Sequence, residues 1–148
     1  MSTIPPGLAK ARGKARRLAM QAIYQWQMTS DNCDEIAKQY VDDTDMKDID
    51  AEYYHELFKG VVTSVDTLDQ LLEKHMPRTA ESVDPVERAI IRLAAYEFTN
   101  RLDVPYKVVL NEAVMLAKKF CAENSPAFIN GVLDKVAHEV RSIEVSAT

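Results

Sequence analysis

Apolar residues recur at spacings of three and four positions along almost the whole chain, and this periodicity constrains the fold more than any other feature. Four long stripes of this kind are Ala15, Ala19, Ala22 and Trp26; Leu57, Val61, Val65, Leu68 and Leu72; Val109, Ala113, Leu116 and Phe120; and Ile129, Val132, Leu133, Val136 and Val140. Such spacing places side chains on one face of a helix, and no segment shows the strict alternation of a half-buried strand. The sequence therefore predicts an all-α protein.

Capping residues and prolines mark the ends of the helices. We expect helices from Lys10 to about Met28, over 33–41, between Asp50 and Pro77, over 85–99, after Pro105 and from Ser125 onward. The clearest start is Asp84, which supplies a cap acceptor before a proline at the first helical position, with Glu87 at the third. The helix over 85–99 is apolar on most sides, which is typical of a central, buried helix.

Two glycine positions need a separate interpretation. Gly60 lies inside a helical pattern, where it costs about 1 kcal/mol relative to Ala, and we expect it to permit the close approach of another helix. Asn130-Gly131 is a hairpin signal, but helical periodicity continues through it and no alternating strand flanks it. The second pair is therefore predicted to lie within a helix.

A length of 148 residues suits one domain. We expect a compact bundle of six or seven helices, because short connections join the helical segments. The junction between Pro77 and Asp84 divides the chain into two small helical subdomains, at about 10–78 and 79–141. The flanking segments 1–9 and 142–148 are predicted to be flexible tails.

No pattern in the sequence is typical of a catalytic, cofactor or metal site. His55, His75 and His138 are scattered, with no His-Glu-x-x-His helix, and no Gly-x-Ser-x-Gly elbow occurs. Only four glycines are present, which argues against a glycine-rich phosphate loop. Cys33 and Cys121 lie far apart and form no metal motif, which favours a reducing, cytoplasmic setting. No apolar stretch is long enough to span a membrane.

The distribution of charge is more informative than the net charge of −5. Residues 1–19 contain five basic residues and no acid, giving +5: Lys10, Arg12, Lys14, Arg16 and Arg17. Residues 31–56 contain ten acids against two lysines, giving −8. Each run is consistent with a solvated face, but the first also suits contact with phosphates.

Aromatic residues close to the basic run raise the possibility of single-stranded RNA binding, which combines cationic backbone contacts with base stacking. Trp26 falls on the apolar stripe and is predicted to belong to the core. Tyr24 lies off that stripe, as Phe128 lies off the stripe of the last helix, next to a helix N-terminus that attracts anions. These two aromatics are the better surface candidates.

Four segments resemble the NusB family of bacterial transcription antitermination factors, in the family's order. They are ARRLAMQAIYQWQ at 15–27, ERAIIRLAAYE at 87–97, DVPYKVVLNEA at 103–113 and FINGVLDK at 128–135. Each motif alone is moderately specific, whereas together they are highly specific. The resemblance covers roughly residues 10–141.

The resemblance implies an all-helical fold of two subdomains and no enzymatic activity. It implies binding to the boxA element of ribosomal RNA leader transcripts together with NusE, a ribosomal protein that doubles as a transcription factor. It further implies assembly with the RNA polymerase elongation complex and other Nus factors, in the cytoplasm. Some relatives of this fold self-associate, so a homodimer is one expected state of the free chain.

Carried over by position, the resemblance assigns residues to two binding roles. The RNA-binding residues are Arg12, Lys14, Arg16, Arg17, Asn124 and Phe128, and the NusE-facing residues are Tyr24, Met28 and Glu87. The chain departs from the family at Gly13, which interrupts a denser arginine run. It departs also at Asn124, which replaces an acid, and at Ala127, which replaces a basic residue. The loss of an acidic side chain at Asn124 favours RNA binding, whereas the loss of a basic side chain at Ala127 removes one phosphate contact.

Two other functions are compatible with a helical fold of this size, an enzyme and a structural adaptor. A related helical domain is fused to ribosomal RNA cytosine methyltransferases, but this chain has no room for a catalytic half. A purely structural helical adaptor would not need the +5 segment at residues 1–19. That segment is the feature that discriminates between the adaptor and an RNA-binding protein.

Overall fold

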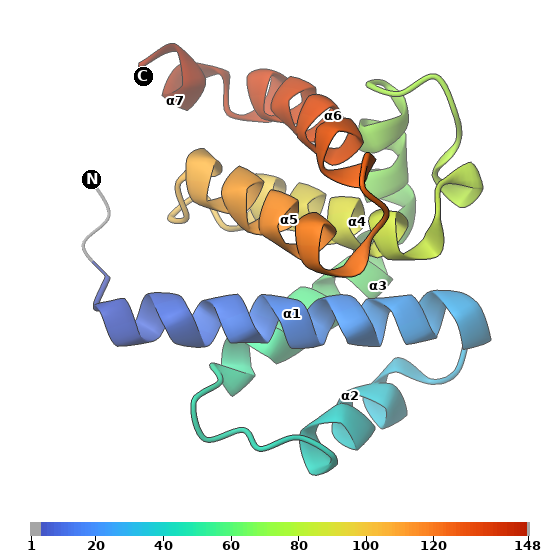
Figure 1. Ribbon diagram of the computed structural model, residues 1–148, viewed down its shortest axis with the longest axis vertical. Coiled ribbons are helices and arrows are strands. Elements are labelled where there is room, and N and C mark those ends of the chain that lie inside the picture. The colour runs from blue at the N-terminus through green and yellow to red at the C-terminus, as the bar shows by residue number, and fades with distance from the viewer. Residues whose placement is uncertain (1–3, 148) are drawn as a thin grey trace.

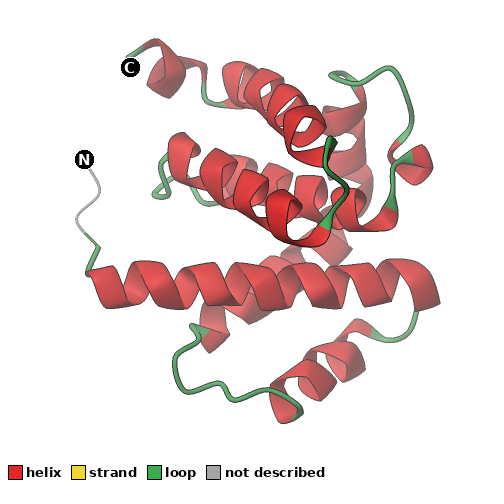
Figure 2. Ribbon diagram, in the orientation of Figure 1, coloured by secondary structure: helices red, strands yellow, loops and turns green. Residues whose placement is uncertain are grey.

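The computed structural model describes residues 4–147, and within that range every regular element is a helix (Figures 1 and 2). The helices are α1 (Pro6–Thr29), α2 (Cys33–Asp42), α3 (Ala51–Glu73), α4 (Pro85–Asn100), α5 (Tyr106–Phe120), α6 (Ser125–Val140) and α7 (Ser142–Ser146). A short 3-10 helix, η1 (Ala80–Ser82), precedes α4. The predicted all-α class is confirmed, and Asn130-Gly131 lies within α6 as expected.

Helix α4 occupies the centre of the bundle, where it packs against α1, α3, α5 and α6. Helix α1 crosses the molecule, with α2 on one side of it and α4, α5 and α6 on the other (Figure 1). Because α4 is covered from several directions, its broad apolar surface is buried as predicted. Helix α1 packs on α4 as well as on α3, so it joins the two predicted subdomains. The boundary near residue 78 stays a prediction.

Two predicted helix starts have the expected capping geometry. The Asp84 carboxylate accepts hydrogen bonds from the backbone N–H groups of Val86 and Glu87, at 3.0 and 3.3 Å. The Asp50 carboxylate accepts from the N–H of Tyr53 at 3.1 Å. These bonds satisfy donors that the first turn of a helix leaves without intrahelical partners.

Gly60 lies where α3 crosses α4. A Cβ atom built at this position would lie 2.2 Å from Cε1 of Tyr96. The missing side chain therefore makes room for the Tyr96 ring, and the predicted close approach of a second helix is confirmed.

Both segments predicted as tails are partly helical. Helix α1 begins at Pro6 rather than Lys10. Proline is tolerated at the first helical position because a backbone N–H there would have no intrahelical partner. At the other end, residues 142–146 form α7. Its Glu144 accepts from the backbone N–H of Tyr106 at 2.8 Å and from Arg141 at 2.6 Å, so contacts with α5 and α6 hold this turn in place. Residues 1–3 and 148 of the predicted tails lie outside the described range.

Candidate RNA and protein interface

Arg16, predicted to contact RNA, is buried between α1 and α4, with 3% of its surface exposed. Its Nε donates to both carboxylate oxygens of Glu97, at 2.9 and 3.0 Å, and its Nη1 donates to Glu112 at 3.2 Å. Burial alone would lower the pKa of Arg16, but the charge and hydrogen bonds of Glu97 raise it above its usual value. Arg16 points inward because it shares a helix face with the buried Met20 and Ile23. Its assignment as a surface RNA contact conflicts with this position.

Arg12 is also largely withdrawn from solvent. Its side chain is 15% exposed and lies between Asp50 and Asp103, at 3.8 and 4.0 Å. The guanidinium lies over the ring of Tyr53, 4.8 Å from the ring centroid. Arg12 therefore belongs to the interface between α1, α3 and the α4–α5 connection, and only part of it is available to a ligand.

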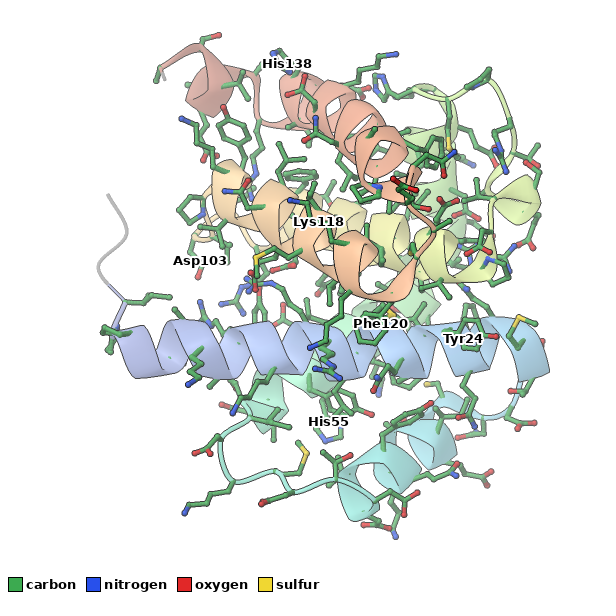
Figure 3. All side chains as sticks on the ribbon, viewed as in Figure 1. Tyr24, His55, Asp103, Lys118, Phe120 and His138 are labelled. Carbon is green, nitrogen blue, oxygen red and sulfur yellow. The ribbon has the colours of Figure 1, made fainter. Side chains whose placement is uncertain are left out.

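The exposed cations of α1 follow one face of the helix. Lys10, Lys14 and Arg17 are exposed at positions i, i+4 and i+7. The Arg17 guanidinium lies over the Phe120 ring at the end of α5, 5.1 Å from its centroid. Phe120 lies between α5 and α1 in Figure 3, where Lys118 is labelled on the same helix. We call Lys10, Lys14, Arg17, Lys118 and Lys119, all exposed, the basic face.

The predicted contacts Asn124 and Phe128 lie just beyond Phe120 in the chain. Asn124 is exposed and caps α6 without a side-chain hydrogen bond from the helix. Phe128 is half-buried, and the guanidinium of Arg78 lies 5.7 Å from its ring centroid. Two arginine–aromatic pairs, Arg17 with Phe120 and Arg78 with Phe128, thus flank the α5–α6 connection.

Two residues of these arginine–aromatic pairs, Phe120 and Arg78, do not stand out in the sequence. Phe120 belongs to an apolar stripe, although it is partly exposed at the last position of α5. Arg78 lies in the connection after α3 and is not part of any sequence motif. Arg78 lies close to Phe128 only because the fold brings the end of α3 next to α6.

The three residues predicted to face a partner protein gather near the end of α1. Tyr24 and Met28 are 38% and 54% exposed, although both are large apolar side chains. Glu87 lies in the first turn of α4. The Gln27 side chain ties the two helices together at this place, because its Nε2 donates to the carbonyl oxygen of Pro85 at 2.8 Å. We call Tyr24, Met28 and Glu87 the partner face.

The next candidates in residues 4–147 are metal-ligating and thiol side chains. No cluster of three or more His, Cys, Asp or Glu side chains there could hold a metal ion. Burial, together with the nearby carboxylates of Glu87 and Asp84, raises the pKa of the Cys121 thiol to about 11, which keeps it protonated near neutral pH. None of the described helices combines the length and apolar character needed to cross a bilayer.

The fold and the surface together define a small helical protein with a basic face next to the Phe120 ring and with exposed apolar side chains at the end of α1. A model of the NusB family matches residues 13–138, and the chain belongs to that family. It is 51% identical over 140 residues to the transcription antitermination protein NusB of Teredinibacter turnerae, an alignment that covers 94% of this chain and 95% of that protein.

Solved structures show the same fold. T. maritima NusB superposes with a TM-score of 0.81 at 25% identity, covering 99% of both chains. A crystal structure of the antitermination factors NusB and NusE in complex with dsRNA contains a chain that superposes with a TM-score of 0.80 at 28% identity. That match covers 87% of this chain and 97% of the other.

Proposed function

We propose that this protein is a transcription antitermination factor that binds boxA RNA of ribosomal RNA leader transcripts together with NusE. In this role it supports processive elongation by RNA polymerase and the synthesis of ribosomal RNA. Membership of the NusB family supports the proposal. The observation that carries it is the row of exposed cations on α1 beside the Phe120 ring, together with the exposed Tyr24 and Met28 near the end of the same helix.

The basic face is suited to single-stranded RNA. Lys14 and Arg17 are exposed and face solvent, where phosphates can approach them. Partly exposed Phe120 and Phe128 offer surfaces for unstacked bases, and the arginines that cover them are themselves stacking partners for bases. Each cation that contacts a phosphate of a single strand contributes about −0.7 to the slope of log K against log salt.

The partner face is suited to a basic protein such as a ribosomal protein. It offers two large apolar side chains, Tyr24 and Met28, and Glu87 adds a carboxylate in the first turn of α4, which the Gln27–Pro85 hydrogen bond ties to the end of α1. An apolar anchor beside charged residues is typical of protein interfaces. Because the chain is acidic overall, a cationic partner would also reduce its repulsion of RNA. We therefore propose that RNA binding is weak for the chain alone and stronger in the complex.

The proposal includes a non-enzymatic role in the cytoplasm. The raised pKa of Cys121 and the lack of a metal-binding cluster among the described residues are consistent with it. A binding protein of this kind acts by bringing RNA and a second protein together.

Co-purification with NusE and boxA RNA tests the proposed function. We expect a ternary complex on size exclusion, with RNA bound more tightly when NusE is present. A scrambled RNA of the same length and composition serves as the control. Equal affinity for both RNAs, or no effect of NusE, would contradict the proposal.

A further inference from the structure

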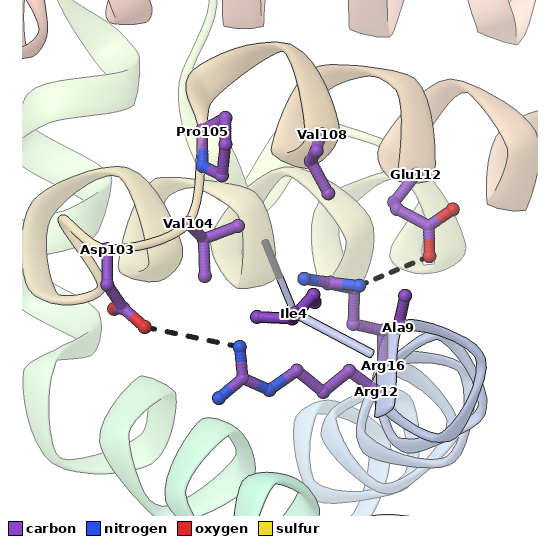
Figure 4. A pocket seen from close by; sticks show the side chains of 9 residues that line it. All are labelled: Ile4, Ala9, Arg12, Arg16, Asp103, Val104, Pro105, Val108 and Glu112. Carbon is purple, nitrogen blue, oxygen red and sulfur yellow. Dashed lines mark hydrogen bonds and ion pairs between the residues drawn. The ribbon is translucent and has the colours of Figure 1, made fainter. Parts of the chain in front are cut away.

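A cavity of about 310 Å³ opens between the first turns of α1 and the start of α5 (Figure 4). Its apolar wall consists of Ile4, Ala9, Val104, Pro105 and Val108, and its charged residues are Arg12, Arg16, Asp103 and Glu112. The volume lies at the lower end of the range for small-molecule sites, which are concave, mostly apolar and carry a few polar groups. Neither the basic face nor the partner face accounts for this cavity.

Arg12 lines the cavity with its guanidinium, whose Nη1 lies 4.0 Å from Asp103. Its Nε is buried on the side of Asp50, at 3.8 Å, and has no hydrogen-bond partner among the described residues. Its contacts with Asp50 and Asp103, at 3.8 and 4.0 Å, are ion pairs that lie beyond the 3.2 Å limit of a good N–H···O bond. Arg16 beside it differs, because its guanidinium is committed to Glu97 and Glu112. A ligand oxygen or ring nitrogen in the cavity would meet the Nη groups of Arg12 on the side of Asp103, not the buried Nε.

Asp103 places an acceptor beside this donor. Hydrogen bonds from Arg101, at 3.0 and 3.1 Å, hold the pKa of Asp103 below its usual value, so the carboxylate is ionised at neutral pH. Its side chain is 59% exposed, which leaves further lone pairs open to a ligand. Figure 4 shows Arg12 reaching towards Asp103, with both side chains among those that line the cavity. The rim thus presents a donor and an acceptor side by side above an apolar wall.

We propose that this cavity takes one unstacked guanine base of the bound RNA. Guanine offers O6 and N7 as acceptors to an arginine and an N2 amino group as a donor to a carboxylate. Adenine carries an amino group in place of O6, which would meet the donors of Arg12. The flat face of the base would pack on Val104 and Val108, as splayed bases do on side chains in sequence-specific RNA recognition. The inference rests on the proposed RNA binding, which the exposed Lys10 and Lys14 near Arg12 on α1 support.

Nucleotide titration monitored by methyl NMR tests the cavity directly. We expect GMP at millimolar concentration to shift the methyl signals of Val104 and Val108 saturably. The affinity for GMP should exceed that for AMP by about fivefold or more, the lower end of what a bidentate base contact discriminates. Inorganic phosphate should leave these signals unchanged. Equal responses to GMP and AMP, a response to phosphate alone, or no response to GMP would overturn the inference.

A pair of tryptophan variants on α5 connects the cavity to RNA. Val108→Trp fills the cavity from its wall, whereas Met115→Trp adds the same ring at an exposed position of the same helix that does not line the cavity. We expect Val108→Trp to remove the GMP response and to weaken binding of a guanine-containing RNA several-fold, and Met115→Trp to do neither. Wild-type RNA affinity in Val108→Trp would overturn the cavity assignment and leave the proposed function standing. Failure of the wild type to bind any RNA would overturn both.

Discussion

The Nε of Arg16 donates to both carboxylate oxygens of Glu97, at 2.9 and 3.0 Å, where α1 crosses α4. Both residues are almost fully buried, and the Tyr53 hydroxyl donates to the same carboxylate. A buried ion pair with a third hydrogen-bonding group is costly to break, because removal of one partner leaves the other charge without compensation. Arg16 therefore fixes the crossing of the two helices from inside the basic N-terminal run.

Arg16→Ala is expected to reduce the free energy of unfolding by about 3–5 kcal/mol, since it strands the Glu97 carboxylate in the core. Urea unfolding measures the change. Lys14→Ala, two positions earlier and exposed, is the control and should change stability by less than about 0.5 kcal/mol. A stable Arg16→Ala variant that loses RNA affinity would show instead that Arg16 contacts RNA.

Gly60→Ala is expected to destabilise the protein by up to about 2 kcal/mol, because overpacking against the Tyr96 ring costs about 1–3 kcal/mol and helix propensity returns only about 1 kcal/mol. The new Cβ would lie 2.2 Å from that ring. The control is Gly131→Ala in α6, where no atom lies within 4 Å of the added Cβ. This second change should stabilise the helix by about 0.5–1 kcal/mol. Thermal unfolding of the two variants should therefore shift in opposite directions. A shift in the same direction would contradict the close packing of α3 on α4.

The fold follows from local sequence patterns much more completely than the site does. The carboxylates of Asp50 and Asp84 accept hydrogen bonds from backbone N–H groups no more than three positions later, so their capping roles can be derived from the sequence. The burial of Arg16 depends on Glu97, which lies 81 positions away, and no local pattern reports that pairing. In the same way, α7 depends on the contact of Glu144 with Tyr106, so its sequence alone resembles a tail.

The two phenylalanines near the α5–α6 connection differ in how far the sequence alone places them. Phe128 could be singled out because it lies off the apolar stripe of α6, and it is half-buried beside Arg78. Phe120 lies on the apolar stripe of α5, so the sequence does not single it out, but at the last position of the helix its ring is only partly covered. Its pairing with Arg17 arises from the packing of α5 beside α1.

Phe128→Ala is expected to weaken RNA binding by about 1–3 kcal/mol, the contribution of one stacked base. Fluorescence anisotropy with a single-stranded boxA RNA measures the loss. Because Phe128 is half-buried, Phe128→Leu serves as a control that keeps apolar packing and removes the ring. Unchanged RNA affinity in both variants, with the fold intact, would assign Phe128 to packing alone.

Charge reversal on the partner face is expected to separate partner binding from RNA binding. Glu87→Lys should weaken binding of NusE about tenfold or more, because it places a like charge against a basic partner. The same variant should leave the affinity of the isolated chain for RNA unchanged or slightly increased. Calorimetric titration of NusE gives the first quantity and anisotropy the second. Undiminished binding of NusE would remove Glu87 from the interface.

In the proposed function, the exposed cations of α1, rather than the buried arginines beside them, bind the RNA backbone. The most direct measurement is the salt dependence of RNA affinity for the wild type and for Lys14→Ala/Arg17→Ala, with circular dichroism confirming the fold. Two lost phosphate contacts should make the slope of log K against log salt less negative by about 1.4 and weaken binding at every salt concentration. An unchanged slope and unchanged affinity in the folded double variant would contradict the account.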